Sequence, residues 1–128
     1  MVKNRYEVAV VIPDDHKRIL VYRDFNLPNS LWDLPKSEIQ GGDFKENAQR
    51  IVSERLGLEA KIKHDLGALS HPFGDIILYT QVYGIKGKVN DIAFSNGFKW
   101  VDVNELVDIA QNSSLAARIY LKSIGKKW

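Results

Sequence analysis

Cysteine is absent from this 128-residue chain, and long apolar runs are missing as well. Without cysteine, the chain cannot form disulfides, use a thiolate nucleophile or bind zinc or iron–sulfur clusters through sulfur. The apolar run near the N-terminus, residues 8–12, is far shorter than a signal-peptide core or the roughly 20 residues of a membrane span. We therefore expect a cytoplasmic protein without membrane contact.

A strong excess of one charge is also missing. Lysine and arginine number 18 against 16 acidic residues, and the net charge is +2. This balance permits an anionic ligand but does not by itself favour nucleic acid. The histidines His16, His64 and His71 lack the paired spacing of a metal site. A hydrophobic content of 45% predicts a single globular domain over residues 1–128.

The chain alternates β-rich runs with turn residues. This pattern predicts strands at residues 6–12, 18–23, 31–34, 60–69, 75–85 and 97–103. The first two are separated by a turn, which predicts a hairpin-like unit, and residues 36–42 and 86–96 are expected to be connections. Helices are predicted at residues 44–56, from residues 104–106 onward, and at residues 115–124 behind Ser113 or Ser114. The order predicts an α+β fold, or a mixed-sheet α/β sandwich.

The helix at residues 44–56 has the clearest pattern. Asp43 and Glu46 have the spacing of a capping box, and Gly57 is a stop signal. Its apolar stripe consists of Phe44, Ala48, Ile51, Val52 and Leu56. Arg55 falls near the centre of this stripe, where an unpaired guanidinium is unfavourable. The prediction is an internal salt bridge to Asp33, Asp43 or a sheet carboxylate; direct binding of a ligand phosphate and a snorkelling side chain remain alternatives.

Residues 31–58 carry a motif that resembles a known family. Arg50, Val52, Glu54, Gly57 and Leu58 have the spacing of the Nudix box, G-x5-E-x7-R-E-U-x-E-E-x-G-U, where U is aliphatic. The segments RILVYRDFNLPNSLWDLP and FKWVDVNEL resemble the family's sequence before and after the box. The resemblance implies a Nudix-type α/β/α sandwich with a mixed β-sheet. It also implies, for active members, hydrolysis of a pyrophosphate linkage with Mg or Mn.

The chain departs from the box at the residues that matter most for chemistry. Ile51 stands at the glutamate of R-E, and Arg55 stands at the second glutamate of E-E. Lys36 and Ser37 replace the Gly-Gly that follows L-P in the family. Pyrophosphate hydrolysis needs clustered carboxylates to hold a divalent ion, and a guanidinium repels such an ion. We therefore expect a degenerate metal site without a bound cofactor.

The first hypothesis is a binding domain with little or no hydrolysis. Its ligand would be nucleotide-like or phosphorylated, or a macromolecular partner such as protein or DNA. The candidate ligand-binding residues are Arg23, Arg50, Arg55, Trp32, His71 and Phe73. Structural roles compete for some of them: Arg50 is expected to pair with Glu54 as a brace, and Trp32 to form core or cleft wall.

The second hypothesis is a divergent Nudix hydrolase that uses Mg or Mn. Glu54 and Glu46 would be its catalytic acids, and Glu54 or Asp43 its metal ligands. Glu46 and Glu54 lie about 12 Å apart along a helix, too far to share one ion. This hypothesis therefore requires the preceding loop to bring Asp43 or Glu38 near Glu54.

The third hypothesis is recognition of a damaged base in DNA. The segment SHPFGDIILYTQVYG resembles part of the C-terminal Nudix-like domain of adenine DNA glycosylases, in which a His-x-Phe loop precedes a strand. His71 and Phe73 would then contact DNA, although a plain turn is the competing interpretation. The low net charge offers little electrostatic attraction toward a duplex.

Overall fold

The computed structural model describes residues 2–39, 41–89, 97–112 and 114–128. Its elements follow in the order β1 (Lys3–Val11), β2 (Ile19–Tyr22), β3 (Lys36–Glu38), α1 (Phe44–Arg50), the π-helical turn η1 (Ile51–Arg55), β4 (Ile62–Phe73), β5 (Ile76–Ile85), β6 (Phe98–Val101), α2 (Val103–Gln111) and α3 (Leu115–Ser123). None of the helices formed by these residues is long and apolar enough to cross a membrane.

The strands form two sheets. The larger sheet has the order β3-β1-β5-β4, and the smaller one pairs β2 with β6. β1 runs parallel to β5, whereas β3 pairs with β1, and β4 with β5, in antiparallel orientation. A parallel pair requires a crossover connection, which here includes the helix between the two strands. The larger sheet is therefore mixed, as the sequence predicts.

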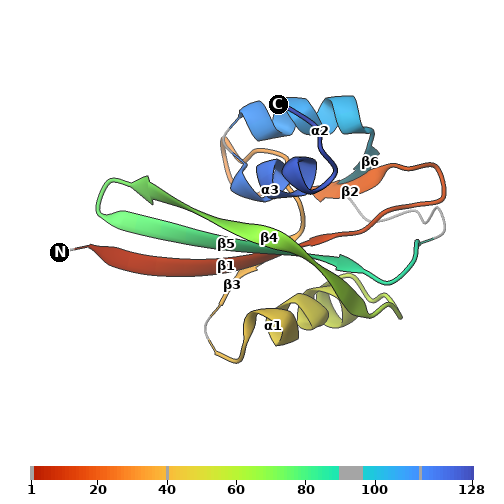
Figure 1. Ribbon diagram of the computed structural model, residues 1–128, viewed down its shortest axis with the longest axis horizontal. Coiled ribbons are helices and arrows are strands. Elements are labelled where there is room, and N and C mark those ends of the chain that lie inside the picture. Colours follow the sequence, from red (N-terminus) through yellow and green to blue (C-terminus); the bar gives the residue numbers. More distant parts are fainter. Residues whose placement is uncertain (1, 40, 90–96, 113) are drawn as a thin grey trace.

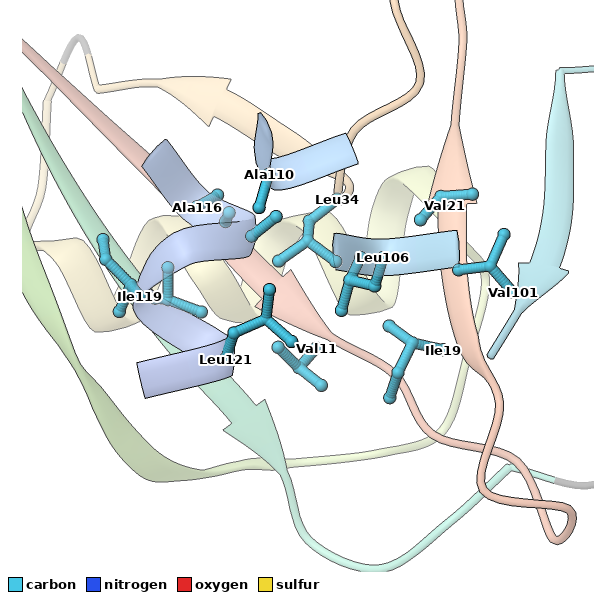
Figure 2. Close-up of a cluster of buried hydrophobic side chains, with 13 residues drawn as sticks. Val11, Ile19, Val21, Leu34, Val101, Leu106, Ala110, Ala116, Ile119 and Leu121 are labelled. Carbon is cyan, nitrogen blue, oxygen red and sulfur yellow. The ribbon is translucent and has the colours of Figure 1, made fainter. Parts of the chain in front are cut away.

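Helices cover both faces of the larger sheet, with α1 on one face and α2 and α3 on the other (Figure 1). Side chains of β1 alternate between these two layers: Val8 and Val10 pack on the α1 side, and Ala9 and Val11 on the opposite side. Figure 2 shows the second layer, where Leu106 of α2 is fully buried among the strands. The predicted α/β/α sandwich is confirmed.

Side-chain caps begin the helices close to the predicted positions. The Asp43 carboxylate accepts the Glu46 N–H at 2.6 Å, and Glu46 accepts the Asp43 N–H at 3.3 Å, which completes the predicted capping box. Ser114 caps α3, whereas Ser113 lies outside the described residues. Asp102 caps α2 at the start of the predicted short helix.

The strand prediction at residues 31–34 is wrong. Only Asp33 pairs there, through an isolated bridge to Tyr22. The edge strand β3 forms instead at Lys36–Glu38, within the predicted connection. An edge strand can present polar side chains to water, so its sequence lacks the apolar pattern that marks a central strand.

The predicted hairpin of residues 6–12 and 18–23 is only partly formed. The two segments meet at the Pro13–Ile19 bridge and through the Leu20 N–H, which donates to the Ile12 carbonyl at 3.0 Å. β1 already pairs with β3 on one edge and β5 on the other, so it has no free edge for β2. β2 therefore continues into the second sheet with β6.

A buried carboxylate stabilises the turn between β1 and β2. Asp14 is fully buried, and its carboxylate accepts the main-chain N–H groups of His16 and Arg18 at 2.8 Å and Arg18 Nε at 2.6 Å. Burial raises the pKa of Asp14, but these hydrogen bonds and the Arg18 charge outweigh burial and lower the pKa overall. Because its pKa is lower in the folded state, this stabilisation exists above the unfolded pKa. It is lost as pH falls through the folded value.

We predict that Asp14→Asn lowers the free energy of unfolding at pH 7 by about 1–3 kcal/mol, since buried donors lose a charged acceptor. The difference from the parent protein should narrow when urea unfolding is repeated at pH 3, because the unfolded parent chain then binds a proton at this carboxylate that the folded protein binds less readily. Asp15→Asn, on an exposed neighbour, is the control and should change stability little at either pH. If Asp14→Asn lowers the free energy of unfolding equally at both pH values, the stabilisation does not come from the ionised Asp14 carboxylate.

Candidate functional site

A cavity of about 680 Å³ opens beside the helix formed by α1 and η1, here called the site helix (residues 44–55). Its lining residues come from the helix and from the segment at and after β3: Ser37, Glu38, Gly41, Asn47, Arg50, Ile51, Glu54 and Arg55. Two guanidinium groups and two carboxylates are among them, so their formal charges cancel. The cavity is thus lined by charged groups whose formal charges sum to zero, with acceptors on both the helix and β3.

The site helix changes its winding at η1. The Leu56 N–H donates to the Ile51 carbonyl at 3.0 Å, a separation of five residues instead of four. A π-helical turn of this kind is rare and is often found at functional sites. The wider turn rotates the following residues relative to an α-helical wheel, and Glu54 and Arg55 are both exposed at the cavity. The prediction that Arg55 lies inside the apolar stripe is therefore wrong.

Ile51 keeps the place that the apolar pattern predicts. Its side chain is 1% exposed and packs with Val8, Val10 and Val52 between the site helix and the sheet. The family box has a glutamate at this position. In this chain, the same position contributes an apolar wall and no oxygen ligand.

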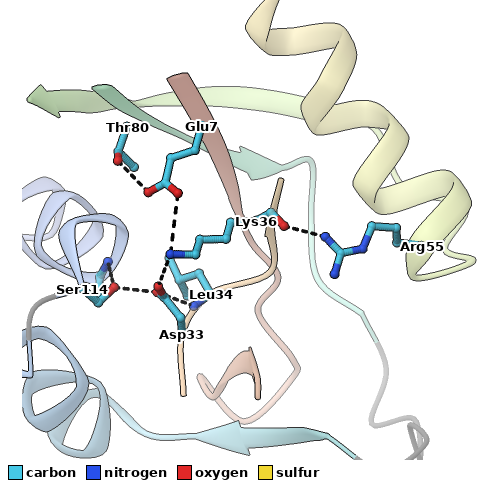
Figure 3. Close-up of polar contacts among 8 residues, drawn as sticks. Glu7, Asp33, Leu34, Lys36, Arg55, Thr80 and Ser114 are labelled. Carbon is cyan, nitrogen blue, oxygen red and sulfur yellow. Dashed lines mark hydrogen bonds and ion pairs between the residues drawn. The ribbon is translucent and has the colours of Figure 1, made fainter. Parts of the chain in front are cut away.

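Within the described residues, Arg55 does not form the predicted salt bridge to an internal acid. Arg55 donates from Nη1 to the Lys36 carbonyl oxygen (Figure 3). Its guanidinium lies 5.8 Å from the centroid of the Tyr22 ring. Asp33 pairs with the Lys36 ammonium instead, at 3.0 Å, and Asp43 caps the helix. Arg55 is thus oriented by a neutral carbonyl and forms no ion pair with a carboxylate of the described residues.

The expected brace between Arg50 and Glu54 is also absent: neither forms an ion pair with any other described residue. Pairs four residues apart face each other on an α-helix, and the π-helical turn disturbs that alignment. Both side chains therefore point into the cavity region without a protein partner there.

Two further residues line the cavity, Glu38 from β3 and Asn47 from the site helix. Glu38, at the end of β3, lines the same cavity as Glu54, and the second hypothesis requires a carboxylate from this part of the chain near Glu54. Asn47 was not predicted: it is buried, and its amide donates to the carbonyl oxygens of Gly41 at 2.7 Å and Asp43 at 2.8 Å. A polar residue beside the apolar stripe was the only sequence signal for this role.

Comparison with known proteins assigns this architecture. A family model described as NUDIX domain matches residues 3–122. The chain belongs to the Nudix family. Among solved structures, it resembles a MutT protein from Methanosarcina mazei Go1 with a TM-score of 0.77 and 17% identity, over 97% of this chain and 95% of the other.

Two other solved structures share the fold at similarly low sequence identity. The Ap4A hydrolase of C. elegans gives a TM-score of 0.68 at 19% identity, over 98% of this chain and 97% of that one. The DNA mismatch repair protein MutT, family Nudix hydrolase, from methicillin-resistant Staphylococcus aureus 252 gives 0.70 at 19% identity, with 98% of each chain covered. At these identities, the similarity concerns the fold.

Two carboxylates line the cavity of this Nudix domain, whereas magnesium and manganese prefer several oxygen ligands. Within the described part of the chain, no group of three His, Asp or Glu side chains is arranged to hold a metal. Glu38 and Glu54 are the two carboxylates at the cavity, and Arg55 adds a positive charge beside them. Asp43 and Glu46 are engaged in the capping box at the start of the helix. Neither lines the cavity.

Arg23 and Trp32 belong to a separate aromatic cluster of the Nudix domain. The Arg23 guanidinium lies 4.9 Å from the centroid of the Phe25 ring, Phe25 meets Trp32 edge to face at 5.8 Å, and the Lys99 ammonium lies 4.4 Å from the Trp32 ring. The Arg23 Nε is buried without a hydrogen-bond partner among the described residues. Trp32 also packs against the core, as its structural interpretation predicts.

Neither His71 nor Phe73 lines the cavity, and the prediction that they form a loop is wrong. Both are part of β4, with their rings 4.8 Å apart, near the hairpin end at the left of Figure 1. Pro72 is tolerated within this strand because β4 is an edge strand, where a missing N–H costs no ladder hydrogen bond. The turn contains Gly74 instead.

A polar network connects the cavity wall to the opposite face of the sheet (Figure 3). The Lys36 ammonium lies 3.0 Å from Asp33 Oδ2 and 3.6 Å from Glu7 Oε2, while Thr80 and Ser114 donate hydroxyl hydrogen bonds to these two acids. Burial lowers the pKa of Lys36, but the charges of Asp33 and Glu7 outweigh it and raise the pKa above the usual lysine value. The network therefore stabilises the folded protein fully at pH values below the ordinary lysine pKa. This stabilisation is lost as pH rises through the higher pKa that Lys36 has in the folded protein.

We predict that Lys36→Met lowers the free energy of unfolding at pH 7 by about 1 kcal/mol, because Glu7 and Asp33 then face each other without a cation. Adding Asp33→Asn to this variant should recover part of the loss, since one of the two facing charges is removed. Urea unfolding measures both effects, and Lys45→Met, on the exposed side of the site helix, is the control. Greater destabilisation by the second change would argue against like-charge repulsion as the cause.

Proposed function

We propose that this Nudix domain binds a phosphorylated, nucleotide-like ligand in the cavity beside the site helix, with little or no hydrolysis. One observation carries the proposal. Where the family box has two glutamates, the cavity has the buried wall residue Ile51 and the exposed cation Arg55. The first cannot ligate a metal, and the second attracts an anion directly.

Arg55 is suited to hold a phosphate. A guanidinium has five N–H donors, and one nitrogen of Arg55 donates to the Lys36 carbonyl, which fixes the orientation of the group. The remaining donors are available for bidentate contact with phosphate oxygens, and Arg50 on the same helix supplies a second cation. A ligand phosphate between these two groups would need no metal ion for charge balance.

The two carboxylates define the rest of the ligand. Glu38 and Glu54 offset the arginine charges, so a free phosphate gains little net electrostatic attraction in this cavity. Carboxylates accept hydrogen bonds from hydroxyl groups, as a ribose would offer. A phosphate joined to a sugar can therefore accept hydrogen bonds from the arginines and donate hydrogen bonds to the glutamates. The shared fold with an Ap4A hydrolase supports the same ligand class.

A second candidate function is residual metal-dependent hydrolysis of a pyrophosphate linkage. It is favoured by one observation: Glu38 and Glu54 line the same cavity. A screen of nucleoside triphosphates and nucleoside diphosphate-linked compounds with magnesium and manganese separates the two functions. Rapid turnover that is abolished by Glu54→Gln would establish the second function and refute the first.

We predict that Arg55→Gln weakens the binding of a nucleoside diphosphate about tenfold, the effect of removing one charge-assisted hydrogen-bonding group. Isothermal titration calorimetry in metal-free buffer measures the change. Lys45→Gln removes the same charge from an exposed position outside the cavity and should leave the dissociation constant nearly unchanged. Equal weakening by both substitutions would show that the effect is one of overall charge and not of this site.

We also predict that Arg55→Glu creates manganese binding, because it adds a third carboxylate beside Glu38 and Glu54. Binding is measured by electron paramagnetic resonance, with circular dichroism as the test of folding. Restoring the other box glutamate as well, by Ile51→Glu, is unsuitable. Ile51 is buried, and a carboxylate there would destabilise the core. A folded Arg55→Glu protein that binds no manganese would contradict the assigned position of Arg55 in the cavity.

A further inference from the structure

A second concave surface lies beyond the C-terminal end of the site helix. One groove of about 460 Å³ is lined by Leu58, Glu59, Ala60, Lys61, Lys86, Lys88 and Val89. A neighbouring groove of about 580 Å³ shares residues 58–61 and continues to Gln49, Ser53 and Gly57. Because they share these residues, the two grooves form one elongated surface, here called the lysine trough. It shares no lining residue with the cavity of the proposed site.

The backbone holds the three lysines of the trough in place. The Lys86 N–H donates to the Lys61 carbonyl at 2.7 Å, so these two residues lie on adjacent paired segments. The Val89 N–H donates to the Pro13 carbonyl at 2.9 Å, which anchors the other end of the turn that carries Lys88. The ammonium groups therefore project from a backbone that is tied at both ends.

The charge of the trough is not neutralised by the protein. None of Lys61, Lys86 and Lys88 forms an ion pair with a carboxylate of the described residues, and Glu59 is the single acidic residue in the lining. Three positive charges and one negative charge give the trough +2, which equals the net charge of the whole chain. This net positive charge is therefore available to an anionic ligand.

We propose that the lysine trough binds a chain of linked phosphates, supplied by a nucleic-acid strand or by inorganic polyphosphate. Three lysines on one continuous surface suit a chain of phosphates better than a single ion, because each ammonium group can neutralise a successive phosphate. Among the described residues that line the trough, none is aromatic, so it offers no platform for base stacking. Recognition rests on the phosphates and is independent of base sequence.

The test compares two triple variants that lose the same charge. Lys61→Gln, Lys86→Gln and Lys88→Gln are combined in the trough variant, and Lys3→Gln, Lys45→Gln and Lys122→Gln in the control, all of them exposed lysines. Fluorescence anisotropy measures binding of a labelled twelve-nucleotide oligouridine and, by competition, of inorganic polyphosphate, over a series of salt concentrations. The trough variant should bind at least about tenfold more weakly. Its salt slope should fall by about 0.7 for each phosphate that the protein no longer neutralises.

The outcomes decide the proposal. Weakening confined to the trough variant supports it, and the competition experiment shows whether the strand or polyphosphate is preferred. Equal weakening in the control variant, or no binding of either polyanion by the parent protein at low salt, overturns it. Urea unfolding of both triple variants verifies that they are folded. The trough variant should bind a nucleoside diphosphate in metal-free buffer as tightly as the parent protein does, because its three lysines lie outside the cavity. Failure of this proposal is thereby distinguishable from failure of the proposed nucleotide site.

Discussion

The packing of the site helix on the larger sheet is the constraint on which the rest of the site depends. Ala48, Ile51 and Val52 are buried against β1 and fix which side of the helix faces the core. With Ile51 committed to this contact, a position that carries a carboxylate in the family pattern becomes apolar wall. The π-helical turn then rotates Glu54 and Arg55 to the surface, where they line the cavity. The contact of Ile51 with the sheet thus both packs the core and removes a carboxylate of the family pattern from the cavity.

Charge is distributed differently at three places in the molecule. In the cavity, two arginines oppose two glutamates, which favours a ligand with both anionic and hydroxyl groups. Behind it, Lys36 compensates two acids with its side chain and orients Arg55 through its carbonyl oxygen. In the lysine trough, the positive charge has no partner among the described carboxylates. This contrast explains why we assign a nucleotide-like ligand to the cavity and a phosphate chain to the trough.

Several sequence predictions failed because they used only the local residue pattern, whereas strand pairing and helix winding also determine the structure at these positions. β3 was missed because an edge strand tolerates polar residues, and His71 and Phe73 were assigned to a loop because Pro72 and Gly74 signal a turn. The burial of Arg55 was predicted from an ideal α-helical period that ends at Ile51. The capping box, the apolar stripe and the layered architecture were correct, since each depends on contacts between residues close in sequence or on simple periodicity.

The sequence by itself determined the family, the sandwich architecture and the replacement of box glutamates by Ile51 and Arg55, because residue identity and spacing are sufficient for these conclusions. Only the tertiary structure decided that Arg55 faces a cavity, that Glu38 joins Glu54 there, and that Lys61, Lys86 and Lys88 converge on one trough. These contacts join segments far apart in the chain. Their geometry depends on strand pairing and helix winding, which residue spacing alone does not specify.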